Sequence, residues 1–434
     1  MFAEKRLEYA CLIAAVLIAA ISLYRSIGYA ISLSHPLYYW DHFGYFDAFR
    51  NWRVNGWDTW SFIHMTHNEH RLGLTKLTML ADLWLTRGSN VVLQVTTYLT
   101  LFASGALLIG ISAIGMRRRY LQMLALLGGV SMVGVVSLGN LAWPTQVQFG
   151  YAQLIPVVLM VVAFQPALKW PGKAVVLLLC IVSTETMASG ILAPVAGLIS
   201  ALVFARDVER SAMMAIGSVL AIVYYLIPTA HDFPVGPTHG FGADNFIYFL
   251  AALGNWTQQA GTASAIYTGA LLGFLALVFG AIGILGARLR GMPFTVLLSV
   301  AIYAGASIAA MAVNRGTAGN PDWALTSRYS SPSILFALSL AGIILRYGLV
   351  TKRNALSALA AIFLLAIVGF SNFSDRAIAE GLEINRQRDE AAALMLRGDY
   401  NAEIYKKIYP SPQVLLQIVD FMRERHYGLF RSAN

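Results

Sequence analysis

Long apolar runs divide this 434-residue chain, and they restrict its fold more than any other feature of the sequence. A helix needs about 20 apolar residues to cross about 30 Å of hydrocarbon. About eleven runs approach that length: 8–31, 91–115, 121–138, 151–164, 174–187, 188–204, 212–228, 265–287, 294–313, 332–345 and 355–370. With 57% hydrophobic and 12% charged residues, the chain is too apolar for an ordinary soluble protein. The sequence therefore predicts an all-α membrane protein with about eleven transmembrane helices.

Two of these assignments leave alternatives open. The first run follows Lys5 and Arg6, as the apolar core of a cleaved signal peptide would. An uncleaved anchor fits better, because the remaining runs then alternate correctly across the membrane. The runs at 174–187 and 188–204 are short and meet at a polar turn around Glu185, so the number of spans between residues 174 and 205 stays open.

Lysines and arginines occur in every second connection between the runs, and they predict the orientation. Cytoplasmic loops are enriched in these residues, which places the N-terminus in the cytoplasm and the longer connections, with the C-terminus, on the opposite face. The basic residues of the predicted cytoplasmic connections are Arg117, Arg118, Arg119, Lys169, Lys173, Arg206, Arg210, Arg288, Arg290, Arg346, Lys352 and Arg353. Contacts with the membrane surface then explain the net charge of +9, and no nucleic-acid partner is expected.

The predicted outer face contains a long first loop and a polar tail. The loop, residues 33–90, is too long for a simple connection. Its stretches 41–57 and 72–85 are amphipathic and are expected to form helices in the membrane interface. The tail, 371–434, has apolar residues at helical spacing and is expected to form a small helical cap. We therefore divide the chain into a transmembrane domain, 1–370, and a C-terminal tail, 371–434.

Titratable side chains crowd the first outer loop. It holds five of the eight histidines beside four of its five acids: His35, His42, His64, His67, His70, Asp41, Asp47, Asp58 and Glu69. The spacing of His64, His67 and His70 would let three imidazoles reach one divalent cation from a helix face. That spacing drifts around a helix, and residues 66–68 resemble a turn, so the cation stays an open alternative and no cofactor is firmly implied. Cys11 and Cys180 lie in separate runs and predict neither a disulfide nor a zinc site.

Several short motifs lie in the predicted outer segments. They are Tyr38-Tyr39-Trp40-Asp41, Asn68-Glu69-His70-Arg71, Ser327-Arg328-Tyr329 and, in the tail, Tyr409-Pro410-Ser411-Pro412 followed by Arg423-Glu424-Arg425 and Leu429-Phe430. Together with an acid after the first span and two interfacial helices in a long outer loop, they resemble bacterial members of the GT-C superfamily of integral-membrane glycosyltransferases. The resemblance covers most of the chain as architecture, while each motif is short.

The resemblance implies an inverting glycosyltransferase of the bacterial inner membrane. Such an enzyme moves a sugar from a polyprenyl-phosphate donor to an extracytoplasmic glycan or lipid, as in the modification of lipopolysaccharide O-antigen. The family places its catalytic acid after the first span, which selects Asp41 as the base, with Asp47 nearly two helical turns further on as the second choice. A single base that assists direct displacement gives inversion and needs no carboxylate nucleophile.

Other residues are candidates for binding the substrates. Those for the donor phosphate are His70, Arg71, Lys76, Arg328 and Tyr329, because arginine forks match phosphate oxygens and lysine supplies a point charge. Those for the acceptor or the sugar are Trp40, Glu69, Trp143 and Glu185. Several candidates have a structural alternative. It is a helix N-cap for Asp41, a solvated helix face for Asp47 and a pair across a turn for Glu69 and Arg71. For Arg328, Tyr329 and Trp143 it is interfacial anchoring, and for Glu185 it is neutralisation of an arginine.

Other functions compete with this hypothesis. A polyprenyl-linked glycan polymerase or ligase would use an oligosaccharide donor, but such proteins tend to carry arginines in a large late outer loop, whereas here the first loop is rich. A lipid or anion transporter would place charges within the spans, and only Glu185 lies convincingly inside one. A role for the tail as a non-catalytic assembly module has no support in the sequence.

Overall fold

Apolar helices dominate the fold, as the hydropathy pattern predicts. The computed structural model describes residues 2–229, 242–286, 291–315 and 320–431. Within these residues, ten helical segments are long and apolar enough to cross a membrane, which confirms the all-α membrane class. They are built on α1 (Phe2–Ser32), α5 (Val91–Ser112), α6 (Arg118–Met132), α8 (Val147–Ala163), α10 (Leu192–Ser200), α11 (Val208–Leu226), α13 (Thr262–Leu285), α14 (Met292–Arg315), α15 (Ser330–Thr351) and α16 (Asn354–Ser371).

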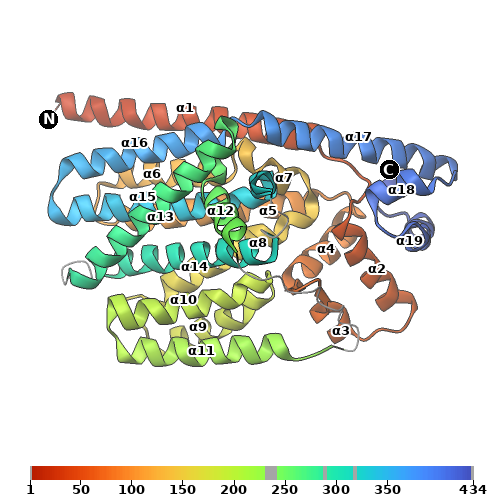
Figure 1. Ribbon diagram of the computed structural model, residues 1–434, viewed down its shortest axis with the longest axis horizontal. Coiled ribbons are helices and arrows are strands. Elements are labelled where there is room, and N and C mark those ends of the chain that lie inside the picture. Colours follow the sequence, from red (N-terminus) through yellow and green to blue (C-terminus); the bar gives the residue numbers. More distant parts are fainter. Residues whose placement is uncertain (1, 230–241, 287–290, 316–319, 432–434) are drawn as a thin grey trace.

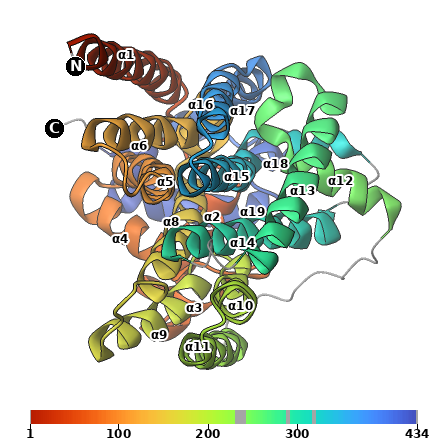
Figure 2. The same ribbon diagram turned by 90° about the vertical axis from the view of Figure 1, so that its left-hand side faces the viewer.

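The number of spans stays open at the place where the sequence left it open. The run at 174–187 forms α9 (Trp170–Thr184), whose 15 residues are too few for it to count among the ten. It nevertheless leads from one end of the bundle, where Lys173 pairs with Glu209, to the other, where Glu185 accepts from the Gly73 N–H. A second short apolar helix, α12 (Ala243–Leu253), has 11 residues. Viewed along the bundle, α5, α8, α14 and α15 lie near its centre and α1 lies at its edge (Figure 2). Most side chains of α15 are accordingly buried.

The predicted basic connections lie at one end of the bundle, together with the beginning of α1 (Figure 1). Arg117 pairs with Glu8 of α1, and Arg346 donates to the carbonyl of Ile114 at 2.7 Å. Other contacts at this end join Arg206 to the carbonyl of Ile284 at 3.2 Å, Arg210 to that of Gln165 at 2.6 Å, and Lys173 to Glu209. Arg288 and Arg290 lie outside the described residues.

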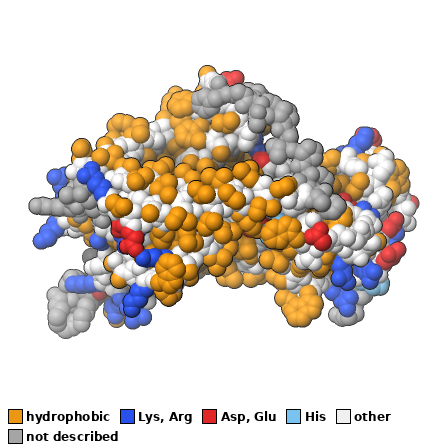
Figure 3. Space-filling view, turned by 90° about the horizontal axis from the view of Figure 1, so that it is seen from below, with side chains coloured by type: hydrophobic (Ala, Val, Ile, Leu, Met, Phe, Trp, Pro, Cys, Tyr) orange, Lys and Arg blue, Asp and Glu red, His pale blue; other side chains and the backbone are white. Residues whose placement is uncertain are grey.

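The surface between the two ends of the bundle is apolar. The space-filling view shows a broad band of hydrophobic side chains, with charged side chains gathered mainly toward its ends (Figure 3). Large side chains such as Val219 of α11 and Leu277 of α13 are mostly exposed. An exposed apolar surface this extensive requires a lipid environment, so the protein is a multi-pass membrane protein.

The first loop and the tail form one compact structure at the other end of the bundle, which we call the head (residues 33–90 and 371–431; Figure 1). Its elements are α2 (Asp41–Val54), α3 (Thr59–His64), β1 (Thr66–His67), β2 (His70–Arg71), α4 (Gly73–Thr86), α17 (Asp375–Arg397), α18 (Ala402–Ile408) and α19 (Pro412–Arg425). Both parts contribute to one hydrophobic cluster, in which Phe46 of α2 lies 5.9 Å from Phe421 of α19 between ring centroids. The tail follows α16 and shares its core with the first loop.

Helices form at both amphipathic stretches of the first loop. Helix α2 occupies most of 41–57, and α4 coincides with 72–85 within a residue or two. The charges that interrupt the second stretch lie inside the protein: Lys76 and Asp82 are 0% and 1% exposed. The Asp82 carboxylate accepts hydrogen bonds from the backbone N–H groups of Asn90 and Val92, each at 2.9 Å, and so joins the end of α4 to the start of α5.

Candidate functional site

A cavity of about 130 Å³ lies where the head meets the bundle. Three short elements of the bundle contact the head at this junction: α7 (Leu138–Ala142), η2 (Pro144–Gln146) and η9 (Ser327–Tyr329). The polar lining of the cavity consists of Asp41, Tyr45, His67, Asn68, Glu69, His70, Gln146, Gln148, Gln153, Ser189, Ser307, Asn314, Arg315, Arg328 and Tyr329. Its apolar wall includes Phe149 and Ala152 of α8, Met311 of α14 and Pro332 of α15. The cavity therefore joins titratable groups of the head to the ends of three membrane-spanning helices.

Asp41 stands at the start of α2 and faces this cavity. It is the first residue of the helix and not its N-cap, because Trp40 occupies the capping position and the helix has no side-chain cap. Its Oδ1 accepts a hydrogen bond from Nε2 of His67 at 3.2 Å, and about 31% of its side chain is exposed. Burial favours the neutral acid, but His67, Arg328 and His70 outweigh it and hold the pKa of Asp41 below its ordinary value of 3.8. Asp41 is therefore ionised at neutral pH.

The residue before Asp41 adopts a strained backbone conformation. Trp40 has a φ of 46°, in the left-handed region that residues with large side chains rarely enter. Its backbone N–H donates to the carbonyl of Ile408 at 2.8 Å, and its indole N–H donates to that of Lys407 at 3.1 Å. Strain of this kind persists only where surrounding contacts impose it. The tail thus fixes the direction in which α2 begins and, with it, the position of Asp41, and Trp40 itself does not line the cavity.

A two-stranded hairpin contributes four residues to the cavity lining: His67, Asn68, Glu69 and His70. Strands β1 and β2 pair antiparallel with His67 opposite His70, and Asn68 in the turn has a φ of 52°, which asparagine tolerates. The backbone N–H of Ala188 donates to Nδ1 of His70 at 3.2 Å, so Nε2 carries the ring proton and lies 3.5 Å from Glu69 Oε1. Burial lowers the pKa of His70 below 6.5, and the imidazole is a neutral donor near pH 7.

Two arginines of the cavity lining lie around Tyr329. The Arg328 guanidinium is 5.0 Å from the centroid of the Tyr329 ring, and that of Arg315 is 5.5 Å from it. Nε of Arg328 and the hydroxyl of Tyr329 are buried without a hydrogen-bond partner. Trp143 lies outside the lining, with Arg328 5.7 Å from its ring centroid. The guanidinium groups of Arg328 and Arg315 have N–H donors that remain unused, so together they can bind an anion.

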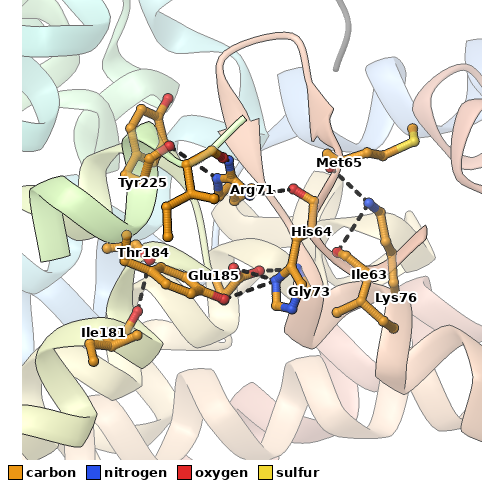
Figure 4. A network of polar contacts seen from close by, with 12 residues as sticks. Ile63, His64, Met65, Arg71, Gly73, Lys76, Ile181, Thr184, Glu185 and Tyr225 are labelled. Atoms are coloured by element: carbon orange, nitrogen blue, oxygen red, sulfur yellow. Dashed lines mark hydrogen bonds and ion pairs between the residues drawn. The ribbon is translucent and has the colours of Figure 1, made fainter. Parts of the chain in front are cut away.

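Two predicted phosphate ligands lie elsewhere and have backbone partners. Arg71 donates to the carbonyls of His64 at 2.8 Å, of Tyr225 at 3.2 Å and of Ile227 (Figure 4). Lys76 donates to the carbonyls of Ile63 at 3.2 Å and Met65 at 2.8 Å. Both side chains are almost fully buried, and neither lines the cavity. Their contacts join the hairpin to the end of α11 and to the turn after α3, and so hold the hairpin in place.

Glu185 and Asp47 also lie outside the cavity lining. Glu185 accepts from the Gly73 N–H at 2.9 Å, and its Oε1 is 2.9 Å from Nδ1 of His64 (Figure 4). Its partner is therefore a histidine of the head and not an arginine. Asp47 pairs with Arg50 one turn along α2 at 2.8 Å, so the second choice of base has its own partner on the helix surface.

The three regularly spaced histidines diverge. His64, His67 and His70 pair with three different carboxylates: Glu185, Asp41 and Glu69, respectively. The residues between them form the hairpin, in agreement with a turn near residues 66–68. Among the described residues, no group of three or more His, Cys, Asp or Glu side chains is placed to hold a metal ion. Both cysteines are free thiols.

The structure thus brings together six predicted site residues: Asp41, His67, Glu69, His70, Arg328 and Tyr329. It also adds residues that sequence reasoning missed, namely Tyr45, Arg315 and the glutamines Gln146, Gln148 and Gln153. A signal for these was present, because Arg315 ends an apolar run and the glutamines occupy one edge of another. No family model, no curated protein and no solved structure matches this chain.

Proposed function

We propose that this protein is an inverting glycosyltransferase that moves a sugar from a polyprenyl-phosphate donor to a hydroxyl group of a glycan or lipid acceptor. The observation that carries the proposal is the cavity in which ionised Asp41 faces Arg315 and Arg328 beside the ends of three spans. Glycosyl transfer from a lipid phosphate needs a base for the acceptor, cations for the leaving phosphate and access for a hydrocarbon chain. The cavity contains residues suited to each task.

Asp41 is the proposed base. It takes the proton of the acceptor hydroxyl as that oxygen forms its bond to the anomeric carbon. The bond from the anomeric carbon to the phosphate oxygen breaks in the same step, and the phosphate leaves with the electron pair. One displacement inverts the configuration. His67 keeps the carboxylate charged and oriented through its hydrogen bond at 3.2 Å.

Arg328 and Arg315 are the proposed partners of the departing phosphate. Charge-assisted hydrogen bonds from guanidinium groups are about twice as strong as neutral ones. Arg328 has an unpartnered Nε, so a phosphate oxygen would satisfy a donor that is otherwise buried without a partner. Neutral His70, which also lines the cavity, adds an uncharged N–H donor.

The lipid part of the donor is proposed to lie along the apolar wall. Phe149, Met311 and Pro332 belong to helices that lead from the cavity into the membrane. We place the basic end of the bundle in the cytoplasm by the charge rule for short loops. The head then lies on the extracytoplasmic face of the inner membrane, with α2 and α4 near the interface. Lipopolysaccharide O-antigen is one acceptor of the proposed class.

The test uses purified protein in lipid nanodiscs with a panel of synthetic polyprenyl-phosphate hexoses and pentoses. Donor consumption and transfer to acceptor glycans are followed by mass spectrometry. We expect Asp41→Asn to reduce turnover by about 10²–10⁴-fold, the range for loss of a general base, while donor binding persists. Asp47→Asn is the matched control on the same helix and should retain turnover. A wild-type protein inert with every donor, or equal losses in both variants, would refute the proposal.

A further inference from the structure

Three glutamines form one wall of the cavity, and the reaction proposed above does not use them. Gln146 ends η2, and Gln148 and Gln153 lie in the first two turns of α8. All three are buried, at 1%, 4% and 3% exposure, and all three line the cavity. They belong to a segment long and apolar enough to span the membrane. Polar side chains in such segments are costly, so those present tend to have a function.

The hydrogen bonds of this glutamine wall are incomplete. Gln148 Oε1 accepts from the hydroxyl of Tyr45 at 3.3 Å, and Gln148 Nε2 donates to Gln146 Oε1 at 3.4 Å. These two amides support one another and connect to α2. In contrast, Oε1 of Gln153 is buried without any hydrogen-bond partner. Nothing on the oxygen side fixes the orientation of this amide, so it can turn to offer either its oxygen or its N–H₂ to a ligand.

The chemistry of the wall indicates what it would bind. An amide carries no charge and both donates and accepts hydrogen bonds, as a hydroxyl group does. The charged residues of the cavity, Asp41, Glu69, Arg315 and Arg328, come from other elements. A polyhydroxylated, uncharged ring would match both the donors and the acceptors of the amides, whereas a carboxylate on the ring would find only uncharged N–H donors and no cation among the three glutamines.

We infer that the glutamine wall binds the hydroxyl groups of an uncharged sugar carried by the lipid donor, with Gln153 as the residue that makes the decisive contact. The inference rests on the proposed function and narrows its substrate class to neutral sugars. It assigns a specificity-determining role to residues that take no part in moving the proton or in stabilising the phosphate.

The test measures binding to the full-length protein in nanodiscs. The probes are one polyprenyl phosphate without a sugar, the same lipid with a neutral hexose, and the same lipid with a hexuronic acid. Gln153→Leu removes the amide at similar volume. Gln258→Leu is the matched control, because Gln258 is also buried with an unpartnered Oε1 but lies on η5 (Asn255–Ala260), outside the cavity lining.

We expect wild-type protein to bind the neutral hexose lipid most tightly of the three. Gln153→Leu should weaken that binding by about tenfold, the scale of one lost hydrogen bond, and leave the affinity for the sugar-free lipid unchanged. Gln258→Leu should alter neither affinity. Four results would overturn the inference and leave the proposed function standing. In Gln153→Leu, they are unchanged binding of the hexose lipid or an equal loss of affinity for the sugar-free lipid. The others are an equal loss of hexose-lipid affinity in Gln258→Leu and a wild-type preference for the hexuronic acid lipid. If wild-type protein bound none of the lipids, both would fail.

Discussion

A substitution at Gly44 should perturb the proposed base, Asp41, indirectly, by displacing its partner His67. Gly44 lies on α2 one turn after Asp41, and a Cβ added there would stand 3.0 Å from Cε1 and 3.3 Å from Nδ1 of His67. These contacts are tighter than ordinary van der Waals packing, so in Gly44→Ala the imidazole must move by a few tenths of an ångström. The ring of Tyr45, 4.9 Å from His67 between centroids, limits the directions open to it.

The displacement should weaken the bond between His67 and Asp41. That bond measures 3.2 Å, already at the long end of the range for N–H···O contacts. A hydrogen bond to a charged group contributes about 1.5–3 kcal/mol, and a partial loss near 1.4 kcal/mol corresponds to about tenfold in rate. We therefore expect turnover to fall by about tenfold. Alanine favours a helix over glycine by about 0.5–1 kcal/mol, so the stability of the protein should not fall with it.

The assay pairs donor turnover with thermal unfolding in nanodiscs. Gly28→Ala is the control, because Gly28 lies in α1 with nothing within 4 Å of an added Cβ, and it should retain the wild-type rate. A Gly44→Ala protein with wild-type turnover would refute the role of His67, and so would a rate loss that merely follows a loss of folded protein.

Two further expectations test the head and the arginines. Burial, with the charge of Arg388, lowers the pKa of His42 from 6.5 to about 3, so an opened head takes up a proton that the folded head excludes. The stability of the folded head should therefore fall by about 2 kcal/mol as the pH drops from 6.5 to about 5. Hydrogen exchange of the α2 amides measures this loss, and His42→Phe should remove it. The same acid sensitivity in the variant would refute the role of His42. Arg328→Ala should weaken donor affinity with little change in stability, whereas Arg71→Ala should lower the unfolding temperature because it leaves buried carbonyls unpaired. Equal donor affinity in wild-type protein and Arg328→Ala would make Arg328 a membrane anchor.

The membrane class was predictable because hydropathy acts locally along the chain. Runs of sufficient length became helices, and the amphipathic stretches of the first loop became α2 and α4. Basic residues in alternate connections also identified loops that meet at one end of the bundle (Figure 1). The span at 174–187 was not predictable to the residue, because α9 ends at Thr184 beside Glu185, whose partner His64 is 121 positions away.

The candidate site was predictable only in part. Asp41 and Arg328 belong to motifs with recognisable residue types, and both line the cavity. Arg71 and Lys76 have equally suggestive types, but backbone carbonyls occupy their donors. The sequence does not show which backbone carbonyls will accept a side-chain hydrogen bond. A buried structural arginine or lysine therefore cannot be distinguished in the sequence from one that binds a ligand. The glutamine wall was not predicted for a related reason, because a glutamine can be recognised as a binding residue only when the cavity that it lines is known.

The measurement that tests the account most directly is an experimental structure of the protein in a lipid nanodisc with a bound polyprenyl-phosphate hexose. The account predicts the phosphate at Arg328 and Arg315, the sugar against the glutamine wall and the anomeric carbon open to an acceptor beside Asp41. A donor bound elsewhere, or bound in the cavity with its phosphate far from both arginines, would contradict it.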